Sequence, residues 1–494
     1  MDTRPKFTAL LILLVGIAVG LLLSPTPAGQ LAQERLTSVS RDAWGEAVTS
    51  AARWNARIDA RTSLFIEYPE LLAAIQKGGA FGGDFSVPIA TQIFNPSEAG
   101  IADARRLGRI EQVTDRTWII YLPLVNVIVF ETDEGIVLVD SGTAAEGPAI
   151  LDLLRSVSSQ PIHTIIYTHG HVDHAYGSWA LVDDQPEVIA QADLVARFER
   201  YQSLPGNLGK YMGQNPEHII ASGDFFVPPT RTFRDELTIS VGGEDFVLRA
   251  RPGETDDQLY VWVPSRSAIA TADYYQGFVP NLGNGKRVQR YPEEWAEALR
   301  EMAAETPRLL LPAHGVAITE SDVIKNNLNL LADALDYVIR YTKDALNAGV
   351  RQDLIPAGLS MPERFSSHPT LQEQYVSWRD ISKMVIRRYT GWWDDIPSHW
   401  SPATFDRQAE EIIALAGGID AVAARARTLA TTDLVMATHL TDWAWFAQPN
   451  NASVQQLVID VYRLRILDES ANTQEILAYV EIMAQARQRQ LESG

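Results

Sequence analysis

The amino-acid sequence predicts an α/β domain followed by an all-α C-terminal region. Two observations lead to this fold class. Between about residues 106 and 320, short runs rich in valine and isoleucine alternate with stretches whose apolar residues recur at helical spacing. Beyond about residue 320 the helical spacing continues to the end of the chain, and the strand pattern stops.

The strands predicted in the α/β region share a high content of valine and isoleucine and are bounded by Asp, Glu or Gly. They lie at residues 109–122, 126–132, 135–142, 163–168, 186–191, 236–240, 245–252, 257–264, 267–273 and 308–315. The run 135–142 is nearly all apolar, which predicts a buried strand. Two helices, at 146–159 and 293–305, alternate with these strands.

The region after residue 320 begins with a predicted helix at 321–349, which ends at Gly349, a usual helix stop. Residues 440–467 predict two helices joined through Gln448-Pro449-Asn450-Asn451, which is similar to one tetratricopeptide-type helix pair. The expected organisation is an N-terminal signal or anchor, an extension, an α/β domain and two helical regions. Their boundaries are 1–28, 29–105, 106–320, 321–400 and 401–494.

Composition excludes several classes of function. The chain has 494 residues, of which 46% are hydrophobic, so it can bury a sizeable core. Its net charge of −20 argues against nucleic acid or an anionic membrane surface as a partner. It has no cysteine, which excludes disulfides, thiolate-bound zinc, iron–sulfur clusters and thiol catalysis.

The N-terminus has the layout of an export signal. Arg4 and Lys6 precede an unbroken apolar run, 7–23, and a segment rich in proline and alanine follows. We therefore expect an exported protein, periplasmic or secreted. The apolar run is near the lower limit of what spans a bilayer, so an uncleaved anchor is the alternative to a cleaved signal, and it would be the only contact with a membrane.

Three of the nine histidines lie in the stretch YTHGHVDHAYG, residues 167–177, directly after a predicted strand. His169 and His171 point the same way if the backbone is extended, because alternate residues share a face. Asp173 and His174 follow in the turn. Imidazole and carboxylate without thiolate suit zinc, with manganese or iron(II) as alternatives. Exposed loop histidines are the plainer interpretation, which the tight spacing disfavours.

Further ligand types occur where other predicted strands end. Glu254 follows a strand and a Pro-Gly turn, Asp273 ends the next strand but one, and His314 ends the strand at 308–315. Each could singly be an ordinary turn residue. As a set in register with the histidine motif, they favour a metal site. Asp140, at the end of another strand, is a candidate to orient a ligand histidine, or else a turn residue.

The motif THGHVDH, followed by Pro-Gly-x-Thr, Ala-Asp and Pro-Ala-His-Gly, resembles the metallo-β-lactamase superfamily. Glu254 stands where most members have histidine, which resembles the alkylsulfatase branch. Residues 387–397, 414–426 and 446–451 also resemble the helical part of alkylsulfatases, so the likeness runs from about 105 to the end. Many relatives continue into a sterol-carrier-like domain, which we expect this protein to lack.

The resemblance implies that residues 106–320 form a catalytic domain, a four-layer αββα sandwich with two Zn²⁺ per chain (or Mn or Fe), and that residues 321–400 form the dimerisation region of a homodimer. It also implies hydrolysis of a small anionic ester, namely an alkyl sulfate. Asp173 and Asp273 are the residues it implies for catalysis. Carried over, one metal is held by His169, His171 and Glu254, the second by Asp173, His174 and His314, and Asp273 bridges. Two such ions would lie about 3.5–4 Å apart.

A sulfate ester needs positive charge in its pocket. The run GNGKRVQR offers Lys286, Arg287 and Arg290, close to where alkylsulfatases place an arginine that binds sulfate. A solvated loop is the plainer interpretation of this run. Tyr211 and Asn215 are further candidates to line the pocket.

Three other functions compete with an alkylsulfatase. A lactonase, phosphodiesterase or β-lactamase-like enzyme would share the metal ligands and differ in the pocket. A periplasmic binding protein would work through its helical half and would have no need of a complete ligand set. A mononuclear iron oxygenase is the third, and an iron assay would distinguish it.

Overall fold

The computed structural model describes residues 60–77, 96–212 and 222–493. The chain forms two compact units. The sandwich unit comprises residues 76–402 with 472–475, and the helical unit comprises 1–75, 403–471 and 476–494. The predicted N-terminal signal or anchor lies outside the described residues.

The first sheet of the sandwich unit has seven strands in the order of the chain. They are β1 (Arg109–Thr114), β2 (Thr117–Tyr121), β3 (Asn126–Glu131), β4 (Ile136–Val139), β5 (Ile162–Ile166), β6 (Glu187–Gln191) and β7 (Arg231–Phe233). Strands β1 to β4 pair antiparallel, and β4 to β7 pair parallel. The parallel half gives β4, β5 and β6 a common direction, so their C-terminal ends lie at one edge.

The second sheet has five strands in the order β12-β11-β10-β9-β8. They are β8 (Glu236–Val241), β9 (Glu244–Ala250), β10 (Leu259–Val263), β11 (Ala268–Ala272) and β12 (Leu309–Pro312). All neighbours pair antiparallel except β11 and β12, which run parallel. Both β10 and β11 are buried along their whole length, which agrees with their apolar sequences.

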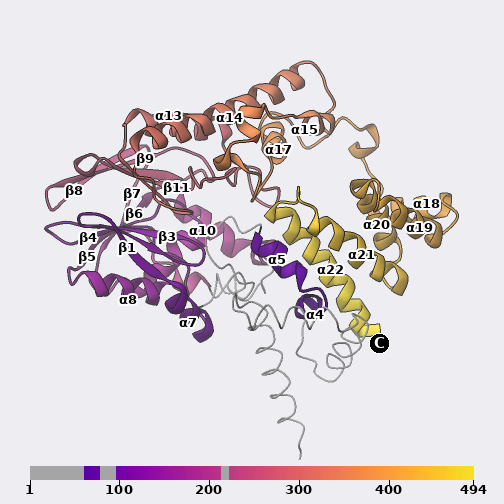
Figure 1. Cartoon of the computed structure of the whole chain (residues 1–494), viewed down its shortest axis with the longest axis horizontal. Coiled ribbons are helices and arrows are strands. Elements are labelled where there is room, and N and C mark those ends of the chain that lie inside the picture. Colours follow the sequence, from indigo (N-terminus) through magenta and orange to yellow (C-terminus); the bar gives the residue numbers. More distant parts are fainter. Residues whose placement is uncertain (1–59, 78–95, 213–221, 494) are drawn as a thin grey trace, which may run out of the picture. The chain divides into compact units, whose positions relative to one another are not determined.

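The two sheets pack face to face, and helices cover their outer faces (Figure 1). In β3, Ile128 and Phe130 face the other sheet, where Phe130 meets Phe246 edge to face. Val127 and Val129 point the other way, toward α8 (Gly147–Val157) and α10 (Leu194–Ser203). The outer face of the second sheet packs against α13 (Pro292–Ala304), α14 (Ser321–Asn347) and α17 (Trp378–Tyr389). This arrangement confirms the predicted αββα sandwich.

Most predicted elements are present, with three differences. The single run at 109–122 is a hairpin, because Arg116 adopts a left-handed conformation and turns the chain between β1 and β2. Strand β7 was not predicted, since its three residues are largely exposed and lack an apolar pattern. Helices α10 and α11 (Pro205–Met212) were also not predicted. Helix α7 (Glu98–Leu107) precedes the first sheet.

The helical part of the sandwich unit begins with α14, which ends at Asn347, two residues before the predicted stop Gly349, a residue with positive φ. The short helices α15 (Leu354–Gly358) and α16 (Glu363–Ser366) follow. Helix α17 begins at a capping box, in which Ser377 and Asp380 each satisfy the other's backbone N–H.

The helical unit contains only helices among its described residues, which confirms the all-α C-terminal region. They are α4 (Ala60–Glu67), α5 (Glu70–Lys77), α18 (Phe405–Leu415), α19 (Ile419–Leu429), α20 (Leu434–Ala447), α21 (Ala452–Leu467) and α22 (Thr473–Ser493). Ion pairs of Arg463 with Glu70 and of Arg487 with Glu67 join α21 and α22 to the two N-terminal helices. No helix of the described ranges combines the length and apolar character needed to cross a bilayer.

Candidate metal centre

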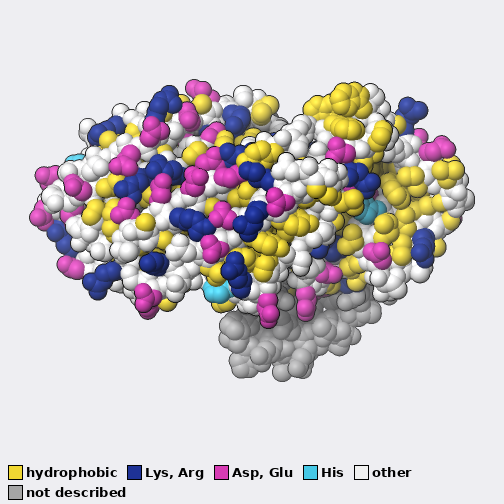
Figure 2. Space-filling model, turned by 90° about the horizontal axis from the view of Figure 1, so that it is seen from above, with side chains coloured by type: hydrophobic (Ala, Val, Ile, Leu, Met, Phe, Trp, Pro, Cys, Tyr) yellow, Lys and Arg dark blue, Asp and Glu magenta, His cyan; other side chains and the backbone are white. Residues whose placement is uncertain are grey.

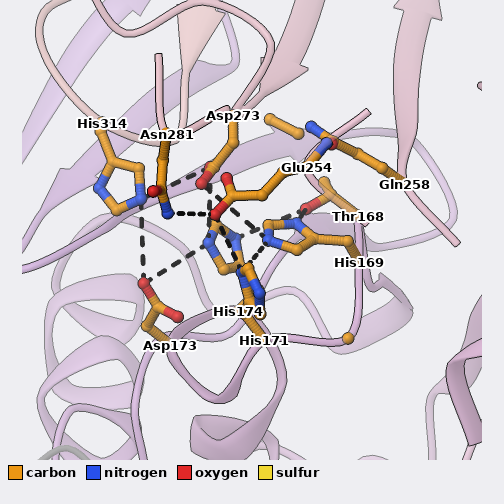
Figure 3. Close-up of polar contacts among 12 residues, drawn as sticks. Thr168, His169, His171, Asp173, His174, Glu254, Gln258, Asp273, Asn281 and His314 are labelled. Atoms are coloured by element: carbon orange, nitrogen blue, oxygen red, sulfur yellow. Dashed lines mark hydrogen bonds and ion pairs between the residues drawn. The ribbon is translucent and has the colours of Figure 1, made fainter. Parts of the chain in front are cut away.

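The histidine motif lies where β5 ends, at the edge of the first sheet. His169 and His171 occupy the loop after the strand, and Asp173 and His174 lie in the one-turn helix α9 (Val172–Ala175). The second sheet brings the remaining polar residues to the same place. Glu254 follows β9, Asp273 follows β11 and His314 follows β12. Figure 3 shows all seven side chains converging.

The first group of candidate ligand atoms lies within 4.8 Å and comes from His169, His171, Glu254 and Asp273. His171 Nδ1 is 3.6 Å from Glu254 Oε1, and His169 Nε2 is 4.0 Å from Asp273 Oδ2. The two imidazoles approach to 2.8 Å between His169 Nε2 and His171 Nδ1. Both sheets therefore contribute donors to this group.

The second group comprises Asp173, His174 and His314. Asp173 Oδ2 is 3.6 Å from His174 Nε2 and 3.8 Å from His314 Nε2. Asp273 Oδ1 lies 3.5 Å from each of the same two nitrogens. The Asp273 carboxylate thus has one oxygen toward each group, which is the position of a bridging ligand.

The separations between donors fit a divalent cation. At 3.5 to 4.0 Å most are too long for hydrogen bonds. Two ligands about 2.0–2.1 Å from a tetrahedral ion lie roughly 3.4 Å apart. His174 Nε2, Glu254 Oε2 and Asp273 Oδ1 are buried without a hydrogen-bond partner among the described residues. Leaving such atoms unsatisfied is costly, and a cation bound in each group would satisfy them.

Neighbouring groups fix how two of the imidazoles are turned. The carboxylate of Asp140 accepts hydrogen bonds from His174 Nδ1 at 2.7 Å, from Thr168 Oγ1 at 2.9 Å and from the Thr168 N–H at 2.8 Å. His314 Nδ1 lies 2.8 Å from the Leu124 carbonyl, to which it donates. Each contact occupies Nδ1 and turns Nε2 of the same ring toward the second donor group.

The protonation states of the first donor group suit cation binding. Burial lowers the pKa of His169 and His171 well below the usual value, and the neighbouring histidines add to this effect. Burial would raise the pKa of Asp273, but His314 and His174 outweigh it and hold the pKa below its usual range. At neutral pH two imidazoles are therefore neutral and Asp273 is ionised, so their lone pairs are available.

A pocket opens beside the first group, next to His171 and Glu254. Its other lining residues are three leucine or valine side chains, Asn207, Tyr201 and five cations, namely Arg197, Arg200, Lys286, Arg287 and Arg290. The apolar members are Leu204, Leu208 and Val288. Over the face drawn in Figure 2, acidic and basic side chains are interspersed. The pocket therefore offers an anion a cationic environment in an acidic protein.

The residues that were predicted to line the substrate pocket differ in how far they are buried and in what they contact. Lys286 and Arg287 line the pocket and are half-buried. Arg290 is 1% exposed, and its Nη1 binds both the carboxylate and the carbonyl of Glu254, at 2.8 and 2.6 Å. The side chain of Tyr211 and all of Asn215 lie outside the described residues.

Two residues near the centre were not predicted. Asn281 donates from Nδ2 to the Glu254 carboxylate. Arg197 on α10 is buried beneath the histidine loop. Asn281 lies in the Pro-Asn turn after Asp273, where an amide carries no chemical signature. Arg197 lies on a helix whose charged sequence resembles a solvated surface.

The comparisons with known proteins agree with this geometry. Residues 121–314 match the model for the metallo-beta-lactamase superfamily, and residues 352–488 match the model for alkyl sulfatase dimerisation. The solved structure of the stereoselective inverting sec-alkylsulfatase Pisa1 from Pseudomonas sp. superposes with a TM-score of 0.70 at 18% identity, covering 91% of this chain and 78% of that one. This likeness concerns the fold.

Curated relatives that match the sequence include alkylsulfatases. A linear primary-alkylsulfatase of Pseudomonas sp. is 25% identical over 353 residues, which is 66% of this chain. The alkyl/aryl-sulfatase BDS1 of Saccharomyces cerevisiae is 22% identical over 403 residues, 74% of this chain. The chain spans 65% and 62% of the length of these two relatives. The 2,4-dinitroanisole O-demethylase subunit alpha of Nocardioides sp. is 29% identical over 301 residues, 57% of this chain and 80% of that protein.

Sandwich, donor groups and sequence match together assign residues 121–314 to a domain of the metallo-β-lactamase superfamily. Within that superfamily the chain is similar to the alkylsulfatases, because residues 352–488, which follow the superfamily match, fit the model for alkyl sulfatase dimerisation. A domain of this superfamily implies binding of a divalent metal, in agreement with the two donor groups.

Proposed function

We propose that this protein hydrolyses alkyl sulfate esters to an alcohol and inorganic sulfate with the help of two zinc ions. The observation that carries the proposal is the pair of donor groups sharing Asp273, with a cation-lined pocket opening beside them. His169, His171 and Glu254 would hold one ion, and Asp173, His174 and His314 the other. The alkylsulfatase relatives support the choice of ester.

The chemistry divides between the metals and the protein. Two divalent cations bound here supply Lewis acidity and bring the pKa of water from 15.7 down to about 7. Lys286 and Arg287 bind the anionic sulfate group, and an arginine fork matches its oxygens. Leu204, Leu208 and Val288 contact the alkyl chain and exclude water from it.

The negative charge of the leaving sulfate is stabilised in place by the pocket. Arginine and lysine side chains already line this position, so little reorganisation is needed when charge develops there. Asp273, held ionised by its histidine neighbours, keeps both donor groups in fixed relation. Asp140 and the Leu124 carbonyl accept from Nδ1 of His174 and His314, so Nε2 of both rings would be presented to the second ion.

Two further parts of the proposal concern assembly and location. The match of residues 352–488 to a dimerisation region supports a homodimer. The basic and apolar N-terminal segment supports export to the periplasm or the medium, with the segment either cleaved or kept as an anchor.

The test is release of inorganic sulfate from a medium-chain primary alkyl sulfate by zinc-loaded protein. Glu254→Ala should abolish release, because it removes a donor of the first group, and Glu236→Ala on the exposed part of β8 should not. Absence of release from wild-type protein that holds two zinc ions per chain would refute the sulfate ester. A panel of a lactone, a phosphodiester and a methyl aryl ether would then identify the reaction.

A further inference from the structure

Helix α10 contacts two of the loops that carry the first donor group, namely the His169–His171 loop and the loop of Glu254. Its residue Arg197 is 4% exposed and reaches Asp257 with Nε at 3.0 Å and Asp256 with Nη2. These two aspartates come two and three residues after Glu254. The buried guanidinium of Arg197 therefore anchors the loop that carries Glu254.

The same arginine supports the histidine loop. Gly170 lies between His169 and His171, and a Cβ built on it would be 2.6 Å from Arg197 Cδ and 3.1 Å from Asp257 Oδ2. The loop backbone thus rests directly on the ion pair. One turn further along α10, the Tyr201 hydroxyl donates to the Gly170 carbonyl at 3.0 Å.

The second donor group has different supports. His174 is oriented by Asp140, and His314 by the Leu124 carbonyl. Among the described residues, Arg197 and Tyr201 bind Asp256, Asp257 and the Gly170 carbonyl, and these contacts do not reach Asp173, His174 or His314. The contacts of Arg197 and Tyr201 therefore serve the first group, although the two groups share Asp273, and Thr168 Oγ1, which binds Asp140, also lies 3.1 Å from His169 Nδ1.

We infer that Arg197, assisted by Tyr201, is a positioning residue for the first metal group alone. It fixes the distance between the His169–His171 loop and the Glu254 loop, which come from different sheets. The inference rests on the proposed function, because it takes the donor groups to bind metal. Groups that orient metal ligands typically change metal affinity by 10- to 100-fold when removed.

The experiment measures zinc dissociation constants by competition with a chromophoric chelator, and it isolates each group in turn. His314→Ala should leave one ion, in the first group. Adding Arg197→Met to His314→Ala should raise the dissociation constant of that ion by 10- to 100-fold. Glu254→Ala should leave one ion in the second group, and adding Arg197→Met there should change its dissociation constant by less than about twofold.

Controls separate this role from general destabilisation. Arg266→Met removes another largely buried arginine, paired with Glu244 away from the centre, and should leave both dissociation constants unchanged. Tyr201→Phe removes one hydrogen bond to the histidine loop and should weaken the first ion in the same direction, by less. It keeps the inference testable if Arg197→Met does not fold.

Equal weakening of both ions by Arg197→Met, or unchanged affinity of the first ion in both variants, would overturn the inference. Failure of wild-type protein to bind two zinc ions would instead refute the proposed metal centre. The two failures are thus distinguishable without an activity assay.

Discussion

Replacing Asp140 by asparagine should remove the ion of the second group while leaving the backbone intact. Asp140 is buried and adopts a φ of 68°, a left-handed conformation that asparagine tolerates well. Asp140→Asn therefore changes charge and hydrogen bonding alone. Asp140→Ala would add strain of about 1–2 kcal/mol at the same position and serves to measure that contribution.

The size of the effect follows from the three hydrogen bonds of the carboxylate. The asparagine oxygen can still accept from the Thr168 N–H, but the amide NH₂ then faces His174 Nδ1. To accept from that NH₂, His174 must carry its proton on Nε2, the atom that would bind the ion. We expect a 10- to 100-fold higher zinc dissociation constant at the second group, or about 1.4–2.7 kcal/mol.

The assay is zinc content after dialysis at a fixed free zinc concentration, together with competition by a chelator. Asp140→Asn should retain one ion where wild-type protein retains two. Asp152→Asn, at an exposed ion pair with Arg105, is the matched control and should retain two. Two ions of unchanged affinity in Asp140→Asn would refute the assignment of Asp140 as the group that orients His174.

Three other predictions concern pH, packing and substrate binding. Burial lowers the pKa of His174, but the surrounding carboxylates outweigh it and raise the pKa to about 10. Below that pH, zinc must displace a proton from His174, so zinc affinity at the second group should increase roughly tenfold for each unit by which the pH is raised. Calorimetry at several pH values would show this increase. The same shift stabilises the metal-free fold fully below about pH 6.5, and this stability is lost as the pH rises through about 10. Gly177→Ala places a Cβ 1.8 Å from the Ser141 carbonyl oxygen and should lower the free energy of unfolding by about 3 kcal/mol in urea titration, whereas Gly206→Ala, with open space, should not. Arg287→Gln should lower kcat/KM for alkyl sulfate by about 10- to 100-fold with both zinc ions retained, and an unchanged value would remove Arg287 from the sulfate site.

The donor groups could be predicted from the sequence because histidine and carboxylate residues, the usual ligands of such metals, occur where predicted strands end. A histidine-rich loop after an apolar strand is rare, and the parallel strands β4 to β6 bring such ends to one edge. The hairpin β1–β2 could not be predicted, because its turn depends on a left-handed arginine, Arg116.

The supports of the site were harder to predict. Arg197 and its two aspartates lie nearly sixty residues apart, in segments whose charges suggest solvent exposure. Arg290 lies in a basic run but is buried against Glu254 rather than exposed. Only tertiary structure distinguishes a buried guanidinium from a solvated one.

Each donor group takes ligands from both sheets, the first sheet through the loop after β5 and the second through the ends of β9, β11 and β12. Neither sheet alone could assemble either group. In a folding intermediate with only one sheet formed, neither donor group would be complete, whichever metal is present in solution. The candidate metal centre is thus complete only once the two halves of the sandwich have closed on each other, and a bound ion would then make their separation harder.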